Sequence, residues 1–238
     1  MSAFTQISTG VIGLDKLLNG GLPAGRVYLV SGPPGSGKST LGVHFLEDGA
    51  KRGENGLYIV TLEHPRNIID DMTNIFPSLP QHIKERRINF ADMGWSLESH
   101  YDGVGKSDKI ATPLNFANKI QDLVKKSDTK RLVLDSSAVI KNVSSDEKVQ
   151  KYELSRFIRK LKDMGCTTII LSEMTEPDNY TVEQFLVHGV IFMHNFLKGA
   201  KMVRGVQIMK MGGVYHSCDI KRMILTDKGI EVFDEKVL

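Results

Sequence analysis

The chain has 238 residues, which suits a single domain over residues 1–238 or a domain with one small appendage. Its 41% hydrophobic and 25% charged residues are typical of a soluble globular protein, and no apolar run reaches the ~18 residues of a membrane span. The formal charge of +3 neither requires nor excludes nucleic acid, and the first residues lack the basic start and apolar run of a signal peptide, so we expect a cytoplasmic protein.

The first predicted elements lead into a glycine-rich loop. Residues 12–18 have the spacing of a short helix, which Gly20 and Gly21 end, and the apolar run 27–30 predicts a strand. The residues that follow match the phosphate-binding pattern G-x-x-x-x-G-K-[ST]: Gly32-Pro33-Pro34-Gly35-Ser36-Gly37-Lys38-Ser39. From about 38 to 51 the apolar residues recur at helical spacing, so the loop stands between a strand and a helix, as this pattern requires.

The chemistry of this loop follows from its residue types. Glycines tolerate positive φ angles and close approach, so backbone N–H groups can curl around phosphate oxygens, and the helix amino terminus adds further donors. We expect Lys38 to reach the β- and γ-phosphates as a catalytic residue, and the Ser39 hydroxyl to ligate Mg²⁺. The candidate nucleotide-binding residues of the loop are Pro34, Gly35, Ser36, Gly37, Lys38, Ser39 and Thr40.

Strands and helices alternate along the middle of the chain. Predicted strands cover about 56–62, 88–92, 131–135 and 166–172, and predicted helices cover about 66–76, 113–126 and 148–164. Pro65 is a stop signal after the first of these strands, and residues 93–111 and 136–147 are predicted to be loops. The strands carry continuous apolar runs, which are typical of a parallel sheet covered on both faces.

The last quarter of the chain has a different pattern. Predicted strands at 188–197, 202–211, 220–225 and 230–233 are joined by short turns, and short connections force antiparallel pairing. The predicted fold class is therefore α/β: a P-loop NTPase core whose mostly parallel central sheet is flanked by helices and extended by C-terminal antiparallel strands.

The cysteine and histidine spacings predict no metal site. Cys166 and Cys218 lie in apolar or mixed stretches, so we expect buried, reduced thiols rather than a disulfide. The seven histidines and two cysteines show neither H-x-x-x-H nor C-x-x-C spacing. A zinc site is therefore not expected.

Two strand ends supply further catalytic candidates. Asp135 ends an apolar strand and fits the Walker B acid that holds Mg²⁺ through water, although a strand-terminal Asp can also be a cap or turn residue. Positions 136 and 137 are serines, so the base that orients water must come from another strand end, and Glu63 is the candidate. His64 either modulates Glu63 or caps the loop, and capping is the favoured interpretation.

Three stretches make the chain similar to a known family. Residues 8–25 lead into the phosphate loop, a strand ends in Glu63, and the C-terminal quarter contains residues 185–191 and 208–216. In these stretches the chain resembles a single-domain member of the KaiC-like group of RecA-superfamily ATPases. The resemblance implies a RecA-like core, ATP with Mg²⁺, a catalytic glutamate at the position of Glu63, and a ring-shaped homo-oligomer, usually hexameric, with nucleotide between neighbouring subunits.

The same resemblance assigns roles near the C-terminus. It implies that Lys210 reaches the nucleotide of the adjacent subunit and that Ser172 senses the γ-phosphate, while Glu173 is interpreted as a structural acid. The family pattern continues Lys-Leu-Arg-Gly, whereas this chain has Gly212 at the arginine position. Because an arginine finger contributes ~10³-fold or more to the rate, we expect ATP to be bound well but hydrolysed slowly.

Two functions compete for such a protein. The first is a nucleotide-dependent switch that signals to an unknown protein partner, and the second is a recombinase-like DNA-binding ATPase in repair or recombination. DNA-binding rings line their pore with basic loops. Here residues 136–150 are neutral, and residues 173–187 contain acids but no Lys or Arg, so the switch is favoured. Self-phosphorylation is disfavoured, because it uses an extra C-terminal domain copy and hydroxyl sites that we do not find in the sequence.

Overall fold

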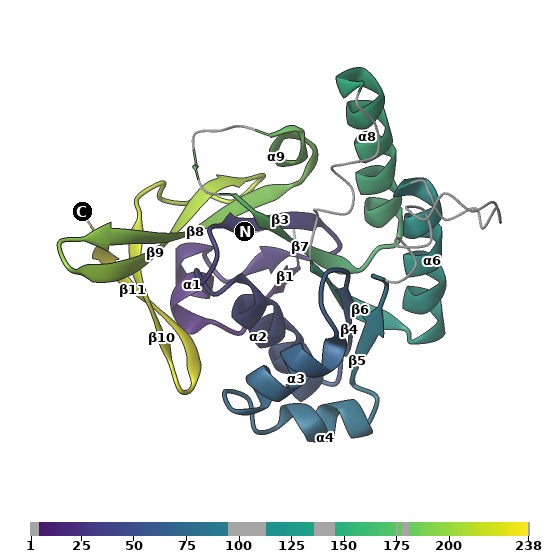
Figure 1. Cartoon of the computed structure of the whole chain (residues 1–238), viewed down its shortest axis with the longest axis horizontal. Helices are drawn as coiled ribbons and strands as arrows, with labels where there is room; N and C mark the ends of the chain where they lie inside the picture. The colour runs from purple at the N-terminus through teal and green to yellow at the C-terminus, as the bar shows by residue number, and fades with distance from the viewer. Residues whose placement is uncertain (1–4, 95–112, 136–145, 175, 178–180, 238) are drawn as a thin grey trace.

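The computed structural model describes residues 5–94, 113–135, 146–174, 176–177 and 181–237 (Figure 1). Its main element is a nine-stranded sheet with the strand order β11-β10-β9-β8-β3-β7-β6-β4-β5. The first five strands of this sheet along the chain are parallel to one another: β3 (Val27–Gly32), β4 (Asn55–Val60), β5 (Ile88–Asp92), β6 (Thr129–Asp135) and β7 (Thr167–Glu173).

The C-terminal strands extend this parallel core. β8 (Gly189–Lys198) runs parallel to β3, and its other edge pairs antiparallel with β9 (Lys201–Met211). The sheet then continues antiparallel through β10 (Lys221–Thr226) and β11 (Gly229–Lys236). The predicted fold class, a mostly parallel sheet with antiparallel C-terminal strands, is thereby confirmed.

Helices cover both faces of the sheet because alternate strand residues point in opposite directions. In β3, Tyr28 and Val30 belong to the core that includes α2, whereas Val27 and Leu29 belong to the core that includes α6 and α8. Figure 1 shows α2, α3 and α4 apart from α6 and α8. The helices are α1 (Ile12–Leu17), α2 (Lys38–Lys51), α3 (Pro65–Thr73), α4 (Leu79–Lys84), α6 (Pro113–Lys126), α8 (Glu147–Asp163) and α9 (Val182–Leu186). Among the described helices, none has the length and hydrophobicity that crossing a bilayer demands.

The helix predicted at about 66–76 is present as α3, but it ends earlier than predicted, and the helix that follows it was not predicted. The first helix, α3, already ends at Thr73, and a second helix, α4, begins at Leu79. Two prolines explain the interruption: Pro77 disfavours helical geometry in the residue before it, and Pro80 occupies the first turn of α4, where no N–H is needed. Likewise Pro65 not only stops the preceding strand but stands in the first turn of α3.

Other short elements also lie outside the predicted set. The strands β1 (Gln6–Ile7) and β2 (Leu22–Pro23) form a separate antiparallel pair, and two residues are too few to show an alternating pattern. The helix α9 lies inside the stretch 173–187, which was expected to be a loop. Most of the predicted loops at 93–111 and 136–147 fall outside the described residues.

The two thiols differ in exposure, which corrects one prediction. Cys166 is buried as expected, but Cys218 is exposed. Cys218 lies in the polar connection between β9 and β10, where its carbonyl accepts a hydrogen bond from Gln207 Nε2 at 2.8 Å. Its neighbours Ser217 and Asp219 are polar and favour a position at the surface. Cys218 is therefore exposed, although thiols are usually buried.

Candidate nucleotide-binding site

The glycine-rich loop connects β3, the central strand of the sheet, to α2. Gly35 and Gly37 have φ angles of 72° and 98°, a region that disfavours other residues, and Gly37 is the N-cap of α2. A Cβ at Gly37 would also lie 3.1 Å from Leu225 Cδ2 of β10. The loop therefore needs glycine at this position both for its backbone conformation and for the close approach of β10.

A pocket of about 460 Å³ opens at this loop. It brings together side chains from three strand ends and from the start of α2, and these are Lys38, Ser39, Thr40, Glu63, Asp135 and Glu173. A larger cavity of about 780 Å³ lies beside Asn55 and Arg87, but its lining does not include the glycine-rich loop. The smaller pocket therefore has the chemistry of a phosphate site.

Lys38 is one of the charged residues that line this pocket. Its ammonium donates to the carbonyls of Gly32 at 2.8 Å and Pro33 at 2.9 Å. Burial lowers the pKa of Lys38 below its ordinary value, and the carboxylates of Glu173 and Asp135 oppose this shift. The only bonds that the structure describes for this ammonium are to carbonyls of the loop itself, so it is positioned to exchange them for phosphate oxygens.

Asp135 and Ser39 meet at the floor of the pocket. The Ser39 hydroxyl donates to Asp135 Oδ2 at 3.0 Å, and the Tyr58 hydroxyl donates to the same oxygen at 2.6 Å. The Asp135 carbonyl accepts from the backbone N–H of Thr61 at 2.8 Å and from its hydroxyl at 3.0 Å. Hydroxyl and carboxylate oxygens are the ligands that Mg²⁺ prefers, so these residues fit the ion that the sequence predicts.

Tyr58 is a site residue that the sequence did not reveal. Its side chain is fully buried, and burial, followed by the nearby Asp135 carboxylate, raises the pKa of Tyr58 well above its ordinary value. The phenol therefore remains a proton donor toward Asp135 at neutral pH. Within a strand of apolar residues, a tyrosine has no sequence signal that separates it from an ordinary core residue.

Glu63 is exposed and lines the pocket just after β4. Partial desolvation raises the pKa of Glu63, and the carboxylates of Asp135 and Asp71 raise it further, so its basicity is increased. His64 accepts a hydrogen bond from the Arg66 N–H at 3.2 Å and is the N-cap of α3, which confirms the capping interpretation.

The end of β7 places its two polar residues differently. Ser172, the candidate γ-phosphate sensor, is 1% exposed within the sheet, where it pairs with Ser31. Glu173 is exposed, lines the pocket and interacts electrostatically with Lys38. The residue that faces the pocket is therefore the one that was interpreted as merely structural.

Lys210 does not join this pocket. It lies in β9 opposite Val190, and its ammonium donates to three carbonyls around the end of α9: Gln184 at 3.1 Å, Phe185 at 3.2 Å and Val187 at 2.8 Å. Desolvation lowers the pKa of Lys210, and the nearby Lys162 lowers it further. Within its own chain, Lys210 therefore stabilises the carboxyl end of α9, and its predicted contact with a neighbouring subunit's nucleotide stays a prediction.

Gly212 lies against the imidazole ring of His188. His188 Nε2 lies 2.9 Å from the Gly212 carbonyl oxygen, and a Cβ at Gly212 would lie 2.9 Å from His188 Cε1. An arginine at this position would therefore displace the imidazole ring.

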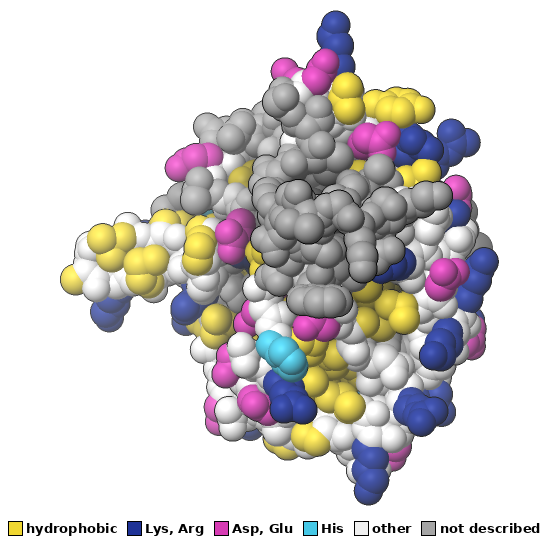
Figure 2. Space-filling model, turned by 45° about the vertical axis from the view of Figure 1, so that its right-hand side comes forward, with side chains coloured by type: hydrophobic (Ala, Val, Ile, Leu, Met, Phe, Trp, Pro, Cys, Tyr) yellow, Lys and Arg dark blue, Asp and Glu magenta, His cyan; other side chains and the backbone are white. Residues whose placement is uncertain are grey.

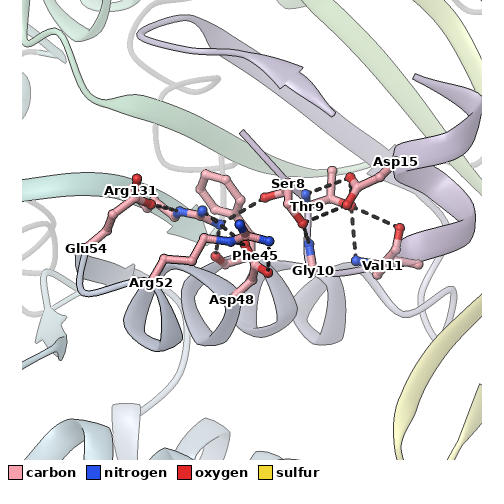
Figure 3. Close-up of polar contacts among 10 residues, drawn as sticks. All are labelled: Ser8, Thr9, Gly10, Val11, Asp15, Phe45, Asp48, Arg52, Glu54 and Arg131. Carbon is pink, nitrogen blue, oxygen red and sulfur yellow. Dashed lines mark hydrogen bonds and ion pairs between the residues drawn. The ribbon is translucent and has the colours of Figure 1, made fainter. Parts of the chain in front are cut away.

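The N-terminal stretch has a structural role (Figure 3). Asp15 accepts hydrogen bonds from the hydroxyls of Ser8 at 2.6 Å and Thr9 at 2.7 Å. The guanidinium of Arg131, at the start of β6, donates to the carbonyls of Ser8 at 2.9 Å and Phe45 at 2.7 Å. This network therefore joins the N-terminal stretch to α2, which follows the phosphate loop, and to β6, which ends in Asp135.

Three further residues hold the C-terminal strands around the loop. Arg204 donates to the Gly35 carbonyl at 3.0 Å, and Asn195 donates to the Pro34 carbonyl at 3.3 Å. His44 Nε2 accepts from the Ile230 N–H at 2.8 Å. Burial lowers the pKa of His44 to about 4, so at neutral pH the ring is neutral and can accept this bond. These contacts join segments that lie far apart in the sequence, so no local sequence motif could have predicted them.

Comparison with known proteins identifies the family. A family model described as "ATPase: KaiC" matches residues 7–237. The chain belongs to the KaiC family. This membership confirms the resemblance stated from the sequence, and it implies a site for ATP.

Curated relatives and a solved structure agree with this assignment. The circadian clock oscillator protein KaiC of Parasynechococcus marenigrum is 28% identical over 238 residues, which cover 96% of this chain and 44% of that protein. The circadian clock protein KaiC3 of Synechocystis is 30% identical over 232 residues, which cover 95% of this chain and 45% of that protein. The crystal structure of a KaiC-like protein from the archaeon Pyrococcus horikoshii OT3 matches with a TM-score of 0.81 and 28% identity, covering 97% of this chain and 99% of that one. The chain thus spans less than half the length of the curated KaiC proteins it matches.

Proposed function

We propose that this KaiC-family chain forms one ATPase domain over residues 1–238, hydrolyses ATP slowly with Mg²⁺, and acts as a nucleotide-dependent oligomeric switch. The observation that carries the proposal is the pocket itself, in which Lys38, Ser39 and Asp135 meet at a glycine-rich loop at the centre of the sheet. Family membership supports the ATP part of the proposal.

In this proposal, different residues of the pocket bind the phosphates, hold Mg²⁺ and activate water. The loop N–H groups and Lys38 bind the phosphates, while Ser39 and Asp135 hold Mg²⁺. The ion, when bound, neutralises negative charge on the β- and γ-phosphates. Glu63 orients a water molecule and accepts its proton, and its raised pKa favours this transfer. The glycine at position 212 leaves the site without the arginine that would speed this step.

Replacing Glu63 by Gln tests the hydrolytic part of this proposal. We expect Glu63→Gln to bind ATP as the wild type does but to lower the single-turnover hydrolysis rate about 100-fold, because the amide cannot accept the proton. The wild-type turnover should stay below about 1 s⁻¹, the lower end of ordinary enzyme rates. Glu235→Gln, which changes an exposed side chain of β11, is the matched control and should leave both quantities unchanged. Equal rates for the two variants would remove Glu63 from the mechanism.

An exposed apolar surface supports self-association. Figure 2 shows the β8–β9 hairpin projecting from the body with hydrophobic side chains at its tip. Of these, Leu197 is 68% and Met202 is 54% exposed. Apolar side chains gathered on a projecting arm are typical of an interaction surface, and we propose that a second copy of the chain covers them.

Sizing in solution tests the assembly. We expect the 26.5 kDa chain to elute as a particle several times larger with Mg²⁺ and ATP, and as a smaller one without nucleotide. The double substitution Leu197→Ser with Met202→Ser should prevent the larger particle while leaving ATP binding unchanged. A particle of constant size under all conditions would contradict a nucleotide-dependent oligomer.

The alternative function, a DNA-binding ATPase, has less support. In the stretch 173–187, Glu173 and Glu176 are exposed, and both would repel nucleic-acid phosphates. Glu183, which the sequence interpretation counted with them, is only 5% exposed in α9 and adds little to this surface. The exposed charge of the described residues in this stretch still favours the switch.

A further inference from the structure

The buried phenol of Tyr58 lies below the pocket floor and contacts the carboxylate of Asp135, a predicted metal ligand, from outside the phosphate loop. Its hydroxyl reaches Asp135 Oδ2 at 2.6 Å, a shorter distance than the 3.0 Å from the Ser39 hydroxyl to the same oxygen. The Tyr58 side chain is 0% exposed. A hydroxyl that donates to a carboxylate forms one of the stronger hydrogen bonds in a protein.

Strand register and packing fix the position of this hydroxyl. Tyr58 of β4 pairs with Val133 of β6, which lies on the same sheet face as Asp135 two residues later. The Tyr58 ring stacks on Phe90 with centroids 5.1 Å apart and planes inclined by 18°. On the α2 side, a Cβ at Gly42 would lie 3.3 Å from Tyr58 Cε2, so the helix backbone closes over the ring. The ring therefore has little freedom to turn its hydroxyl away from Asp135.

The two hydroxyls that bond to Asp135 are expected to behave differently when Mg²⁺ binds. Ser39 is itself a predicted ligand, so its oxygen must turn toward the ion. Tyr58 is not a predicted ligand and keeps its bond to Oδ2. Both of these hydroxyls donate to Oδ2 of Asp135, and no hydrogen bond to Oδ1 is found in the described part of the chain.

We propose that Tyr58 is a positioning residue that orients the Asp135 carboxylate for Mg²⁺. The inference rests on the proposed function, since it assigns a role in the same site. Without the phenol, the carboxylate would lose a fixed donor and rotate among several orientations, each of which must be given up when the ion binds. Nucleotide contacts made by the loop and Lys38 do not depend on this bond.

Replacing Tyr58 by Phe removes only the hydroxyl. It therefore separates the effect on Mg²⁺ binding from the nucleotide contacts made by the loop and Lys38. Binding of a fluorescent ATP analogue would be measured at zero Mg²⁺ and across a Mg²⁺ titration. We expect unchanged affinity without Mg²⁺ and a Mg²⁺ midpoint raised about tenfold, as the loss of one hydrogen bond to a charged group implies. Mn²⁺ bound with ADP should show a correspondingly weaker affinity by electron paramagnetic resonance, a readout that does not require hydrolysis.

Tyr28→Phe is the matched control. Tyr28 is also 0% exposed in a central strand, and its hydroxyl donates at 2.6 Å to the Pro23 carbonyl, away from the pocket. Both variants lose one buried phenol bond, so both should lower the melting temperature similarly, but only Tyr58→Phe should shift the Mg²⁺ midpoint. In an Asp135→Asn background, Tyr58→Phe should add no further shift.

The outcomes distinguish two failures. If the wild type shows no Mg²⁺-dependent nucleotide binding, the proposed function itself is wrong. If the wild type shows it and Tyr58→Phe has the same midpoint as Tyr28→Phe, the function stands and the positioning role of Tyr58 is overturned.

Discussion

Replacing Lys38 by Ala is expected to weaken ATP binding about 100-fold or more, because truncating one member of a desolvated charge pair costs roughly 2–5 kcal/mol. In the structure this ammonium lines the pocket and donates to the carbonyls of Gly32 and Pro33. It also partly offsets the carboxylates of Glu173 and Asp135, which would otherwise repel a triphosphate. Isothermal titration with a non-hydrolysable ATP analogue and Mg²⁺ measures the change.

Lys51→Ala supplies the control for this experiment. Lys51 ends the same helix that Lys38 begins, its side chain is 61% exposed, and its ion pair with Glu47 spans 3.6 Å. Its removal takes away the same charge but leaves the pocket intact, so nucleotide affinity should change by less than about twofold. Similar affinities for the two variants would mean that general charge, rather than the position of Lys38, attracts the nucleotide.

Replacing Arg131 by Met is expected to destabilise the fold by about 3–5 kcal/mol, the usual cost of breaking a buried, hydrogen-bonded charge cluster. The Arg131 side chain is 1% exposed and forms ion pairs with Glu54 at 2.6 Å and Asp48 at 3.1 Å. Methionine fills part of the space but leaves the half-buried carbonyl of Ser8 and the buried carbonyl of Phe45 without their donor. Urea unfolding, followed by circular dichroism, gives the free energy of unfolding.

Arg156→Met provides the comparison for Arg131. Arg156 is on α8, where its side chain is 42% exposed and pairs with Glu153 at 3.3 Å. An exposed pair of this kind contributes about 1 kcal/mol or less, so this variant should unfold close to the wild-type urea concentration. If both variants lost equal stability, the network in Figure 3 would not be the anchor that its geometry implies.

Sequence patterns predicted the sheet better than its small connecting elements. Long apolar runs such as those of β3, β6 and β7 indicate buried parallel strands, because a strand covered by helices on both faces needs apolar side chains on both. The break between α3 and α4 was missed because Ile75 and Phe76 continue the helical spacing, while the prolines at 77 and 80 decide the backbone. The pair β1–β2 is set by tertiary contacts and has no periodicity of its own.

At the candidate site, the sequence predicted the residues that belong to a recognisable motif or strand end. It did not predict residues whose contacts depend on how neighbouring strands align. Lys38, Ser39, Glu63 and Asp135 were predicted from the loop and the strand ends, and the structure brings all four to one pocket. Tyr58 was missed because its contact with Asp135 depends on how β4 aligns with β6. Lys210 was predicted from a family motif to reach a neighbouring subunit's nucleotide, and this stays a prediction. Its bonds to the carbonyls at the end of α9 were not foreseen, because α9 is too short to show a sequence pattern.

The place of β3 in the sheet has a consequence for how the chain folds. Val27 pairs with Thr168 of β7, and Tyr28 pairs with Gly189 of β8, so the strand before the phosphate loop acquires both neighbours only when most of the chain exists. Contacts between residues so far apart in the sequence form slowly. Until they form, an unpaired apolar strand is prone to aggregation. A nascent chain that ends before residue 167 therefore has the complete phosphate-binding motif but lacks β7 and β8, the two strands that pair with β3. We therefore expect the nucleotide site to form late in folding, after β7 and β8 have paired with β3.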